Sequence, residues 1–223
     1  MPESISVVIP ALEEAASIGA AIRSVRAQAE VIVVDGGSAD ATRAVAAEEG
    51  ARVVAAPPGR GRQLAQGARV ATGSWLVFLH ADTRLEAGWA EALAALPAGV
   101  AGGAFRLAID SPRVLYRVIE LGVACRTRLL GLPYGDQAIF ARREAHERIG
   151  GMPDLPLMED VAFVRRLRRV GRLAFPSPRA FTSPRRWERG GIVATTLANW
   201  SLLALYTAGA APEWLARRYR RAS

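Results

Sequence analysis

The stretch Val31-Ile32-Val33-Val34-Asp35-Gly36-Gly37-Ser38 decides the fold of this 223-residue chain. Its four consecutive β-branched residues predict a strand that is buried on both faces, as in a parallel sheet with helices on either side. The Asp-Gly-Gly-Ser that follows is a turn sequence. Asp40 can then cap a helix that runs to Glu49, with Gly50 just past its end. The chain thus passes from a strand through a tight turn into a helix.

The same strand–helix unit recurs along the first half of the chain. We predict strands at 5–9, 31–34, 52–55 and 75–79, and helices at 14–29, 40–49 and from the loop 57–62 to about residue 72. Alternating strands and helices are typical of βαβ units with right-handed crossovers. The sequence therefore predicts an α/β fold around a mostly parallel sheet flanked by helices.

The second half is less regular. Strands are predicted at 103–109 and 137–140, and helices at 114–130, 159–170 and 192–208. We find no internal repeat, no low-complexity tract and no linker. The length also favours one core over two, so we predict a single domain over residues 1–223 that ends in a C-terminal helical segment.

The charge of the chain is basic but does not select a partner. The formal net charge is +8, and all 29 positive side chains are arginines. A coding bias explains this better than function does. Nucleic acid, an anionic membrane surface and a phosphorylated substrate all fit a basic chain. Nucleic-acid binding is disfavoured because the arginines are scattered, without interleaved aromatic residues.

Two further features bear on the cellular context. The single cysteine, Cys125, excludes an internal disulfide. It recurs at helical spacing with Leu115, Val118, Leu121 and Leu129, so we expect a buried structural cysteine and no nucleophile. His146 lies in an arginine-rich segment, and we expect it on the surface. No signal-peptide pattern precedes the first strand, so a cytoplasmic location is expected.

Residues 192–211 raise the question of a membrane. The stretch is apolar but holds several threonines, an asparagine and a serine, so it barely meets the length that a spanning helix needs. One interpretation, which we favour, is a helix that packs on the domain. The other is a helix that lies on the inner face of a membrane, with a basic tail on anionic lipid: Arg217, Arg218, Arg220 and Arg221.

Three polar clusters follow predicted strands: residues 10–14, 35–38 and 80–82. Each cluster alone has an ordinary explanation, as a helix start, a turn or a cap. The carboxyl ends of parallel strands meet at one edge of a sheet, however, and ligands bind there. Neither a P-loop nor a G-x-G-x-x-G loop is present. A divalent cation on a carboxylate is another way to hold a diphosphate, and Asp82 is well placed for it.

At this point the order of motifs becomes specific. The chain contains Val8-Ile9-Pro10-Ala11-Leu12-Glu13-Glu14, then 33–42 with Asp35-Gly36-Gly37-Ser38, then Phe78-Leu79-His80-Ala81-Asp82-Thr83, then Tyr134-Gly135-Asp136-Gln137, and then Met158-Glu159-Asp160. In this order they resemble the family-2 glycosyltransferases of GT-A fold, a Rossmann-like architecture. They are most similar to a small single-domain bacterial subgroup with His-Ala-Asp-Thr in place of Asp-x-Asp. The resemblance covers nearly the whole chain.

The resemblance implies a nucleotide-diphosphate sugar donor, a hydroxyl acceptor and a divalent cation, Mn²⁺ or Mg²⁺. It implies a nucleotide-sugar half at 1–84, an acceptor and catalytic half at 100–190, and a C-terminal segment at 191–223. The pair Glu159-Asp160 matches the catalytic Glu-Asp pair, in which Asp160 is the base. Nucleotide-binding positions are matched by Pro10, Ala11, Glu14, Asp35, Arg60, Arg62, Ala81 and Asp82. Acceptor or diphosphate contacts are matched by Gly135, Asp136, Arg186 and Trp187.

The chain departs from the family pattern at three of these motifs. Gly36 replaces a second aspartate that often contacts the base, and Glu13 stands where asparagine is usual. His80 replaces the first aspartate of Asp-x-Asp. An imidazole suits Mn²⁺ better than Mg²⁺. Two roles remain open for His80: a metal ligand beside Asp82, or a hydrogen-bond partner while Asp82 works with the diphosphate and water.

The implied reaction is a single inverting displacement, which needs one carboxylate base. A hydrolase uses a carboxylate pair instead. Two rival hypotheses remain. A sugar-phosphate nucleotidyltransferase usually carries a glycine-rich basic loop where this chain has Pro10–Glu14. A non-catalytic nucleotide-sugar or membrane-binding module needs no base such as Asp160. The acceptor is not identified, and a lipid-linked one would fit the 192–211 segment.

Overall fold

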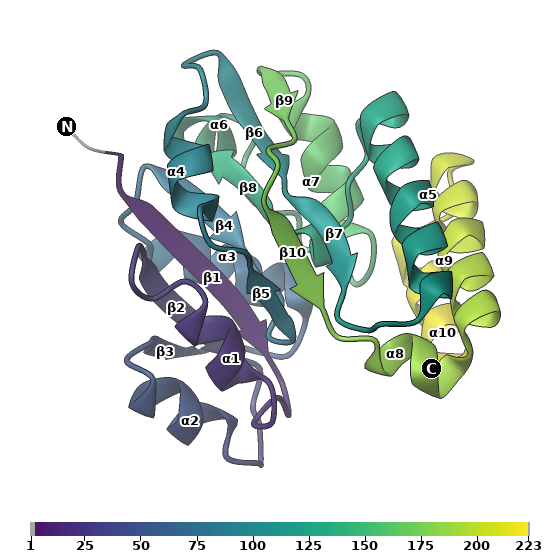
Figure 1. Cartoon of the computed structure of the whole chain (residues 1–223), viewed down its shortest axis with the longest axis horizontal. Helices are drawn as coiled ribbons and strands as arrows, with labels where there is room; N and C mark the ends of the chain where they lie inside the picture. The colour runs from purple at the N-terminus through teal and green to yellow at the C-terminus, as the bar shows by residue number, and fades with distance from the viewer. Residues whose placement is uncertain (1–2, 223) are drawn as a thin grey trace.

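The computed structural model describes residues 3–222, with the backbone alone at 220–222. A large sheet lies at its centre, and helices cover both faces (Figure 1). In spatial order its strands are β3 (Arg52–Ala55), β2 (Glu30–Asp35), β1 (Ile5–Ala11), β4 (Trp75–Phe78), β8 (Ile139–Arg142), β6 (Val100–Ala104) and β9 (Arg172–Ala174). Only β8 runs antiparallel to its neighbours, β4 and β6. The predicted α/β fold with a mostly parallel sheet is thus confirmed.

Alternate residues of the central strands feed two separate cores. On β1, Val7 and Ile9 pack toward one face of the sheet and Val8 toward the other. The first face is covered by α1 (Ile18–Arg23), α2 (Thr42–Glu48) and α4 (Trp89–Ala94), and the second by α3 (Arg60–Val70), α6 (Arg143–Arg148) and α7 (Glu159–Leu167). The β-branched run at 31–34 is buried on both sides because it belongs to both cores.

A small second sheet extends the molecule beside the large one. It holds β5 (Thr83–Leu85), β10 (Arg179–Thr182) and β7 (Arg106–Ile109), in that spatial order. The predicted strand 103–109 is therefore wrong as one strand. Phe105 is buried between the rings of Trp89 and Phe140, and its N–H donates to the Gln137 carbonyl at 2.9 Å. This contact redirects the chain from the large sheet into the small one.

The C-terminal segment, from residue 185 onward, is helical and closes one side of the molecule. It contains α8 (Arg185–Gly190), α9 (Ile192–Thr207) and α10 (Pro212–Ala222), with α5 (Val114–Leu130) beside α9 (Figure 1). Leu202 of α9 and Leu215 of α10 are buried together with Leu157 and Val161. The predicted helices at 114–130 and 192–208 are confirmed to within a residue. Within the described part of the chain, no helix has the length and apolar run that crossing a bilayer requires.

Two sequence expectations about single residues are wrong. Cys125 is exposed, because the apolar stripe of α5 to which it belongs faces outward. His146 is half-buried, since its ring packs against Phe78 and Phe163 with centroid distances of 6.0 and 5.8 Å. The predicted strand 137–140 also shifts: a 3₁₀ turn, η1 (Gly135–Gln137), precedes β8.

Candidate active site

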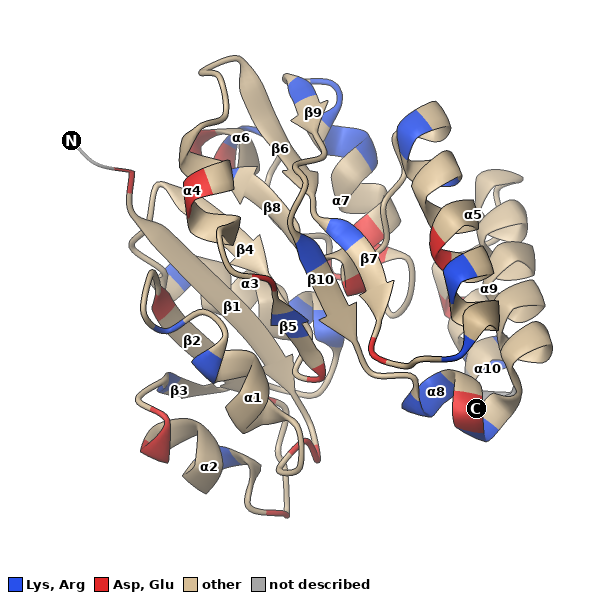
Figure 2. Cartoon of the chain, viewed as in Figure 1, with Lys and Arg blue, Asp and Glu red and all other residues tan. Residues whose placement is uncertain are grey.

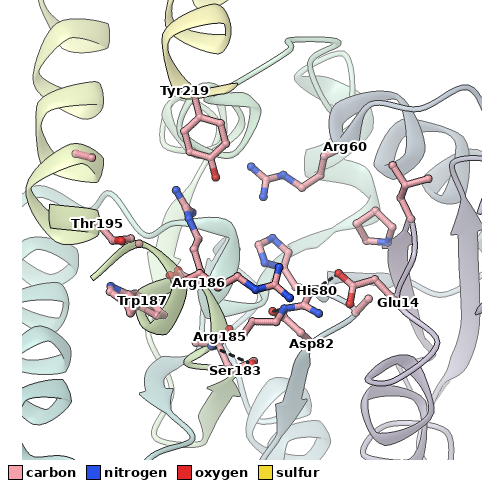
Figure 3. Close-up of a pocket in the computed structure, with 18 of the residues that line it drawn as sticks. Glu14, Arg60, His80, Asp82, Ser183, Arg185, Arg186, Trp187, Thr195 and Tyr219 are labelled. Atoms are coloured by element: carbon pink, nitrogen blue, oxygen red, sulfur yellow. Dashed lines mark hydrogen bonds and ion pairs between the residues drawn. The ribbon is translucent and has the colours of Figure 1, made fainter. Parts of the chain in front are cut away.

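A cavity of about 910 Å³ opens beyond the carboxyl ends of β1 and β4, at the predicted edge of the sheet. Its walls come from the β1 and β4 ends, from α3, and from α8, α9 and α10 across the opening (Figure 3). A smaller cavity of about 90 Å³ adjoins it. The two cavities are lined by most of the predicted site residues: Pro10, Ala11, Glu14, Arg60, His80, Ala81, Asp82, Gly135, Asp136, Asp160, Arg186 and Trp187.

Asp82 follows β4 and is held from two sides. Its backbone carbonyl accepts from the N–H of Ser183 at 3.1 Å, which continues the antiparallel pairing of β5 with β10. Its carboxylate lies 3.2 Å from Nε of Arg185, and the same guanidinium pairs with Glu14. Burial raises the pKa of the Asp82 carboxyl, and the charge of Glu14 adds to this, while Arg185 opposes both. Asp82 and Glu14 are therefore two carboxylates that share one arginine.

His80 is a neutral imidazole in this setting. Burial lowers its pKa most, and the positive charges of Arg60, Arg186 and Arg185 add to this, so that the pKa falls to about 3. Its Nε2 lies against the backbone of Gly135, where an added Cβ would come within 2.7 Å. Gly135 is therefore needed for this close approach. A neutral imidazole can donate or accept a hydrogen bond, and it can ligate a metal.

The residues around Asp82 fit a cation that a bound diphosphate helps to hold. No group of three or more His, Cys, Asp or Glu side chains suited to a metal occurs among residues 3–219. One carboxylate and one imidazole are nevertheless present at the cavity floor, with Glu14 close by. Mg²⁺ and Mn²⁺ are commonly bound by one or two carboxylates together with substrate phosphates and water. The protein alone offers an incomplete coordination shell, which such a substrate would complete.

Asp160 is fixed at the edge of the smaller cavity. Its Oδ2 accepts from the N–H of Gly135 at 2.8 Å, and its Oδ1 accepts from the N–H of Val161 at 2.7 Å. Met158, just before α7, has φ 64°, a left-handed conformation that turns the chain sharply into the helix. Asp160 thus enters the first turn of α7 half-buried, with its carboxylate next to the cavity that His80 and Arg60 also line.

Glu159, which precedes Asp160 in the sequence, lies outside both cavities. It is 1% exposed, and its carboxylate forms an ion pair with Arg60. Burial raises the pKa of Glu159 while Arg60 opposes this, and the pKa of Arg60 rises in return. Neither cavity is lined by Glu159. Its side chain is thus placed to position Arg60, which lines both cavities.

Asp136 adds a second carboxyl next to Asp160. Burial raises its pKa to about 6, and the charge of Asp160 contributes, while Arg126 and Arg186 oppose the rise. Its Oδ1 is buried and has no hydrogen-bond partner among the described residues. A buried polar atom without a partner is uncommon and costs free energy. Asp136, which lines both cavities, therefore has an oxygen whose hydrogen-bonding capacity is unused.

Two predicted nucleotide contacts lie outside both cavities. Asp35 is 2% exposed, and its carboxylate accepts from the N–H groups of Gly37 and Ser38 at 3.0 and 3.1 Å, so it shapes the turn after β2. Arg62 is exposed and pairs with Asp154 at 3.0 Å. The structure brings neither side chain to the cavity.

Several lining residues were not predicted from the sequence, among them Gln63, Arg185 and Tyr219. Gln63 of α3 donates from Nε2 to the carbonyls of Ala11 and Val34 at 2.9 and 2.8 Å, and so ties together the ends of β1 and β2. Arg185 bridges Glu14 and Asp82. Tyr219 reaches the cavity from α10 (Figure 3). Arg185 directly precedes the predicted Arg186, but no local signal marked Gln63 or Tyr219, because their partners are remote in sequence.

Arg186 and Trp187 occupy the wall opposite the sheet. Arg186 is exposed to the cavity, hydrogen-bonds Oδ1 of Asn199 at 2.9 Å and lies over the ring of Tyr219. Trp187 is buried at 7% exposure and packs edge-on against Tyr116 of α5. The indole anchors α8, and Arg186 is then free to face the cavity.

Solved structures with a similar fold include glucosyl-3-phosphoglycerate synthase from Mycobacterium tuberculosis. In complex with Mn²⁺, uridine diphosphate and glucosyl-3-phosphoglycerate, it is 26% identical, with a TM-score of 0.56 over 78% of this chain and 69% of that one. Its complex with Mg²⁺ and uridine diphosphate has a TM-score of 0.61 at 23% identity, over 88% of this chain and 77% of that chain. At that identity the second match shows the fold alone.

Sequence relatives point the same way. An uncharacterized glycosyltransferase of Mycobacterium tuberculosis (strain ATCC 25618 / H37Rv) is 37% identical over 87 residues, 39% of this chain. One of Mycobacterium bovis matches equally. The match spans only about two fifths, 40%, of the length of these relatives. The family model described as "Glycosyl transferase family 2" matches residues 6–147, more than half of the chain. The chain belongs to glycosyl transferase family 2.

Proposed function

We propose that this protein transfers a sugar from a nucleotide-diphosphate sugar to an acceptor hydroxyl, with inversion and with the help of a divalent cation. One observation carries the proposal: a fixed carboxylate, Asp160, stands beside a cavity in which Asp82 and several arginines gather. The related synthase from Mycobacterium tuberculosis, solved with Mn²⁺ and uridine diphosphate, supports this donor class.

In the proposed reaction the side chains divide the work. A divalent cation, when bound with the diphosphate near Asp82 and His80, would supply positive charge for the leaving group. Arg185 and Arg60, each held by a carboxylate, face the same developing charge. Asp160 accepts the proton of the acceptor hydroxyl as its oxygen bonds to the anomeric carbon and the bond to the diphosphate breaks.

Other residues prepare these groups. The N–H groups of Gly135 and Val161 orient the Asp160 carboxylate. Each of its oxygens keeps a further lone pair that can accept the acceptor's proton. Glu159 holds Arg60 and is proposed as a positioning residue, while Pro10, Ala11 and Glu14 line the donor end of the cavity. The acceptor is unidentified. A cytoplasmic location, a lipid-linked acceptor and peripheral membrane contact remain part of the proposal.

Substitution of Asp160 by asparagine tests the reaction. We expect turnover to fall by about 100-fold or more, because general-base catalysis contributes on that order. Asparagine can keep one of the two hydrogen bonds that the carboxylate accepts, so folding should change only modestly and nucleotide affinity should stay near the wild type. Release of the nucleoside diphosphate from a panel of nucleotide sugars and candidate acceptors is the measurement.

The matched control is Glu159→Gln, which acts through Arg60 and should mainly weaken binding. An Asp160→Asn enzyme that keeps most of its turnover would contradict the assignment of the base. Pyrophosphate release from a nucleoside triphosphate and a sugar phosphate would support the nucleotidyltransferase hypothesis instead.

A further inference from the structure

An apolar surface lies on the two helices beside the cavity. Among the side chains that the structure describes, eleven large hydrophobic ones are exposed, and nine of these belong to α5 or α9. The nine are Val114, Leu115, Val118, Leu121, Leu129, Leu130, Val193, Leu197 and Trp200. Single exposed hydrophobic residues are ordinary, but a contiguous group marks an interaction surface.

The side chains on the neighbouring outer sides of the two helices form a surface that we call the α5–α9 face: Val114, Val118, Leu121, Leu129, Val193, Leu197 and Trp200. On α5, positions 114, 118, 121, 125 and 129 recur every three or four residues, so they share one side of the helix. The opposite side of α5 is buried through Tyr116, Val123 and Thr127. The two helices meet at Gly122, where an added Cβ would lie 3.7 Å from the Trp200 ring. The exposed sides of α5 and α9 are therefore neighbours.

The charges around this face are positive. α9 carries no charged residue at all, as its uniform colour in Figure 2 shows. Arg113, just before α5, and Arg128, near its end, border the face; both are exposed, and neither forms an ion pair within the described part of the chain. Arg117 is bound to Glu120 at 3.0 Å, which neutralises the one acidic residue of α5. An apolar surface with a basic border remains.

This combination favours anionic lipid over a second copy of the chain. A symmetric dimer would bring the same patch against itself, so that Arg113 and Arg128 would face like charges. An anionic bilayer instead offers negative headgroups to the arginines and acyl chains to the leucines, with Trp200 at the depth that indole rings prefer. We propose that the α5–α9 face binds the surface of a membrane that contains anionic lipid.

The geometry relates this surface to the cavity. Ala198, Ser201 and Leu205 line the cavity from one side of α9, while Leu197 and Trp200 on the adjoining side belong to the α5–α9 face. A membrane bound to the α5–α9 face would contact α9, the helix whose adjoining side forms part of the cavity wall. In combination with the proposed function, on which this step rests, an acceptor anchored in the membrane would enter the cavity across α9.

Vesicle co-sedimentation tests the proposal. The full chain is mixed with vesicles of phosphatidylcholine alone or with phosphatidylglycerol added. We expect binding to the anionic vesicles, and a loss of at least tenfold in affinity for Leu121→Glu/Trp200→Glu. The matched control, Ala44→Glu/Ala47→Glu, adds the same charges to the exposed side of α2, remote from the face, and should bind as the wild type does.

A second pair of variants tests how much the arginines contribute to binding of anionic vesicles. Arg128→Gln should weaken binding to anionic vesicles several-fold, whereas Arg69→Gln, on the exposed side of α3, should leave it unchanged. Thermal unfolding verifies that all variants are folded, since every substituted side chain is exposed. Raised salt should weaken binding of the wild type.

Three results would overturn the proposal. The wild type could fail to bind anionic vesicles, or Leu121→Glu/Trp200→Glu could bind them as well as Ala44→Glu/Ala47→Glu does. Analytical ultracentrifugation could also show a dimer that the same double variant dissociates, which would assign the face to a second copy. Titration of uridine diphosphate with Mn²⁺ separates this outcome from the proposed function: if the nucleotide still binds, only the membrane proposal fails.

Discussion

Asp136 lies where its surroundings disfavour the ionised carboxylate. Its pKa is raised to about 6 by burial and by Asp160, and one of its oxygens has no described hydrogen-bond partner. In the unfolded chain the carboxyl ionises near its ordinary pKa of 3.8. Folding is therefore favoured most by this group below about pH 4, and the contribution is lost as the pH rises through about 6.

Substitution of Asp136 by asparagine should remove this pH dependence. As the pH rises from about 4 to 7, the variant's free energy of unfolding should increase relative to that of the wild type. The linkage between pKa and stability limits this increase to about 3 kcal/mol. Thermal denaturation of both proteins at the two pH values measures the difference. A melting-temperature difference that is the same at both would contradict the assigned environment.

Ligands bind beyond the carboxyl ends of the strands in a parallel sheet. This rule explains why the sequence predicted the position of several site residues correctly. Pro10 lies near the carboxyl end of β1 and Asp82 follows β4, and carboxyl ends of parallel strands share an edge. The same rule placed Asp35 at this edge, but local backbone donors turn its carboxylate inward. Gln63 and Tyr219 depend on how α3 and α10 pack, which their own neighbours in sequence do not encode.

At the scale of elements, α3 packs tightly onto the sheet. A Cβ added at Gly67 would lie 2.2 Å from Cγ1 of Val8 and 2.9 Å from Cγ2 of Val34. Helix α3 therefore approaches β1 and β2 at a distance that only glycine allows. The same helix carries Arg60 and Gln63 into the cavity, so its position on the sheet also fixes part of the site.

A pair of glycine substitutions tests this packing. Gly67→Ala should destabilise the protein by about 1–3 kcal/mol, the usual range for overpacking a core. Gly122→Ala, in the exposed helix α5, meets only an ordinary contact at 3.7 Å and should stabilise by up to about 1 kcal/mol through helix propensity. Chemical denaturation measures both. Equal effects of the two substitutions would contradict the close approach of α3.

Helical periodicity located α5 correctly but misjudged its environment. The apolar spacing that includes Leu121 and Cys125 was interpreted as a core-facing stripe, yet it faces solvent. Tyr116 and Val123, on the other side, are the buried residues. Period alone identifies an apolar side of a helix. It cannot say whether the chain itself or another surface covers that side.

At the scale of the whole molecule, the cavity gathers positive charge between the sheet edge and the C-terminal helices. Arg60 comes from α3 and Arg185 from α8, and Arg186, Arg189 and Arg218 of α8 and α10 also line the cavity. The first two are paired with carboxylates, whereas no ion pair within the described residues involves the other three. A diphosphate fits this arrangement, since arginine binds phosphate oxygens well.

Calorimetric titration of uridine diphosphate, with Mn²⁺ and then with chelator, tests the central claim most directly. We predict binding with Mn²⁺ that weakens at least tenfold with chelator and in Asp82→Ala. Glu144→Ala, which removes an exposed carboxylate on α6 outside the cavity, should bind as the wild type does. Equal affinity with and without the metal, or an Asp82→Ala protein that binds normally, would contradict a metal-assisted diphosphate site at Asp82.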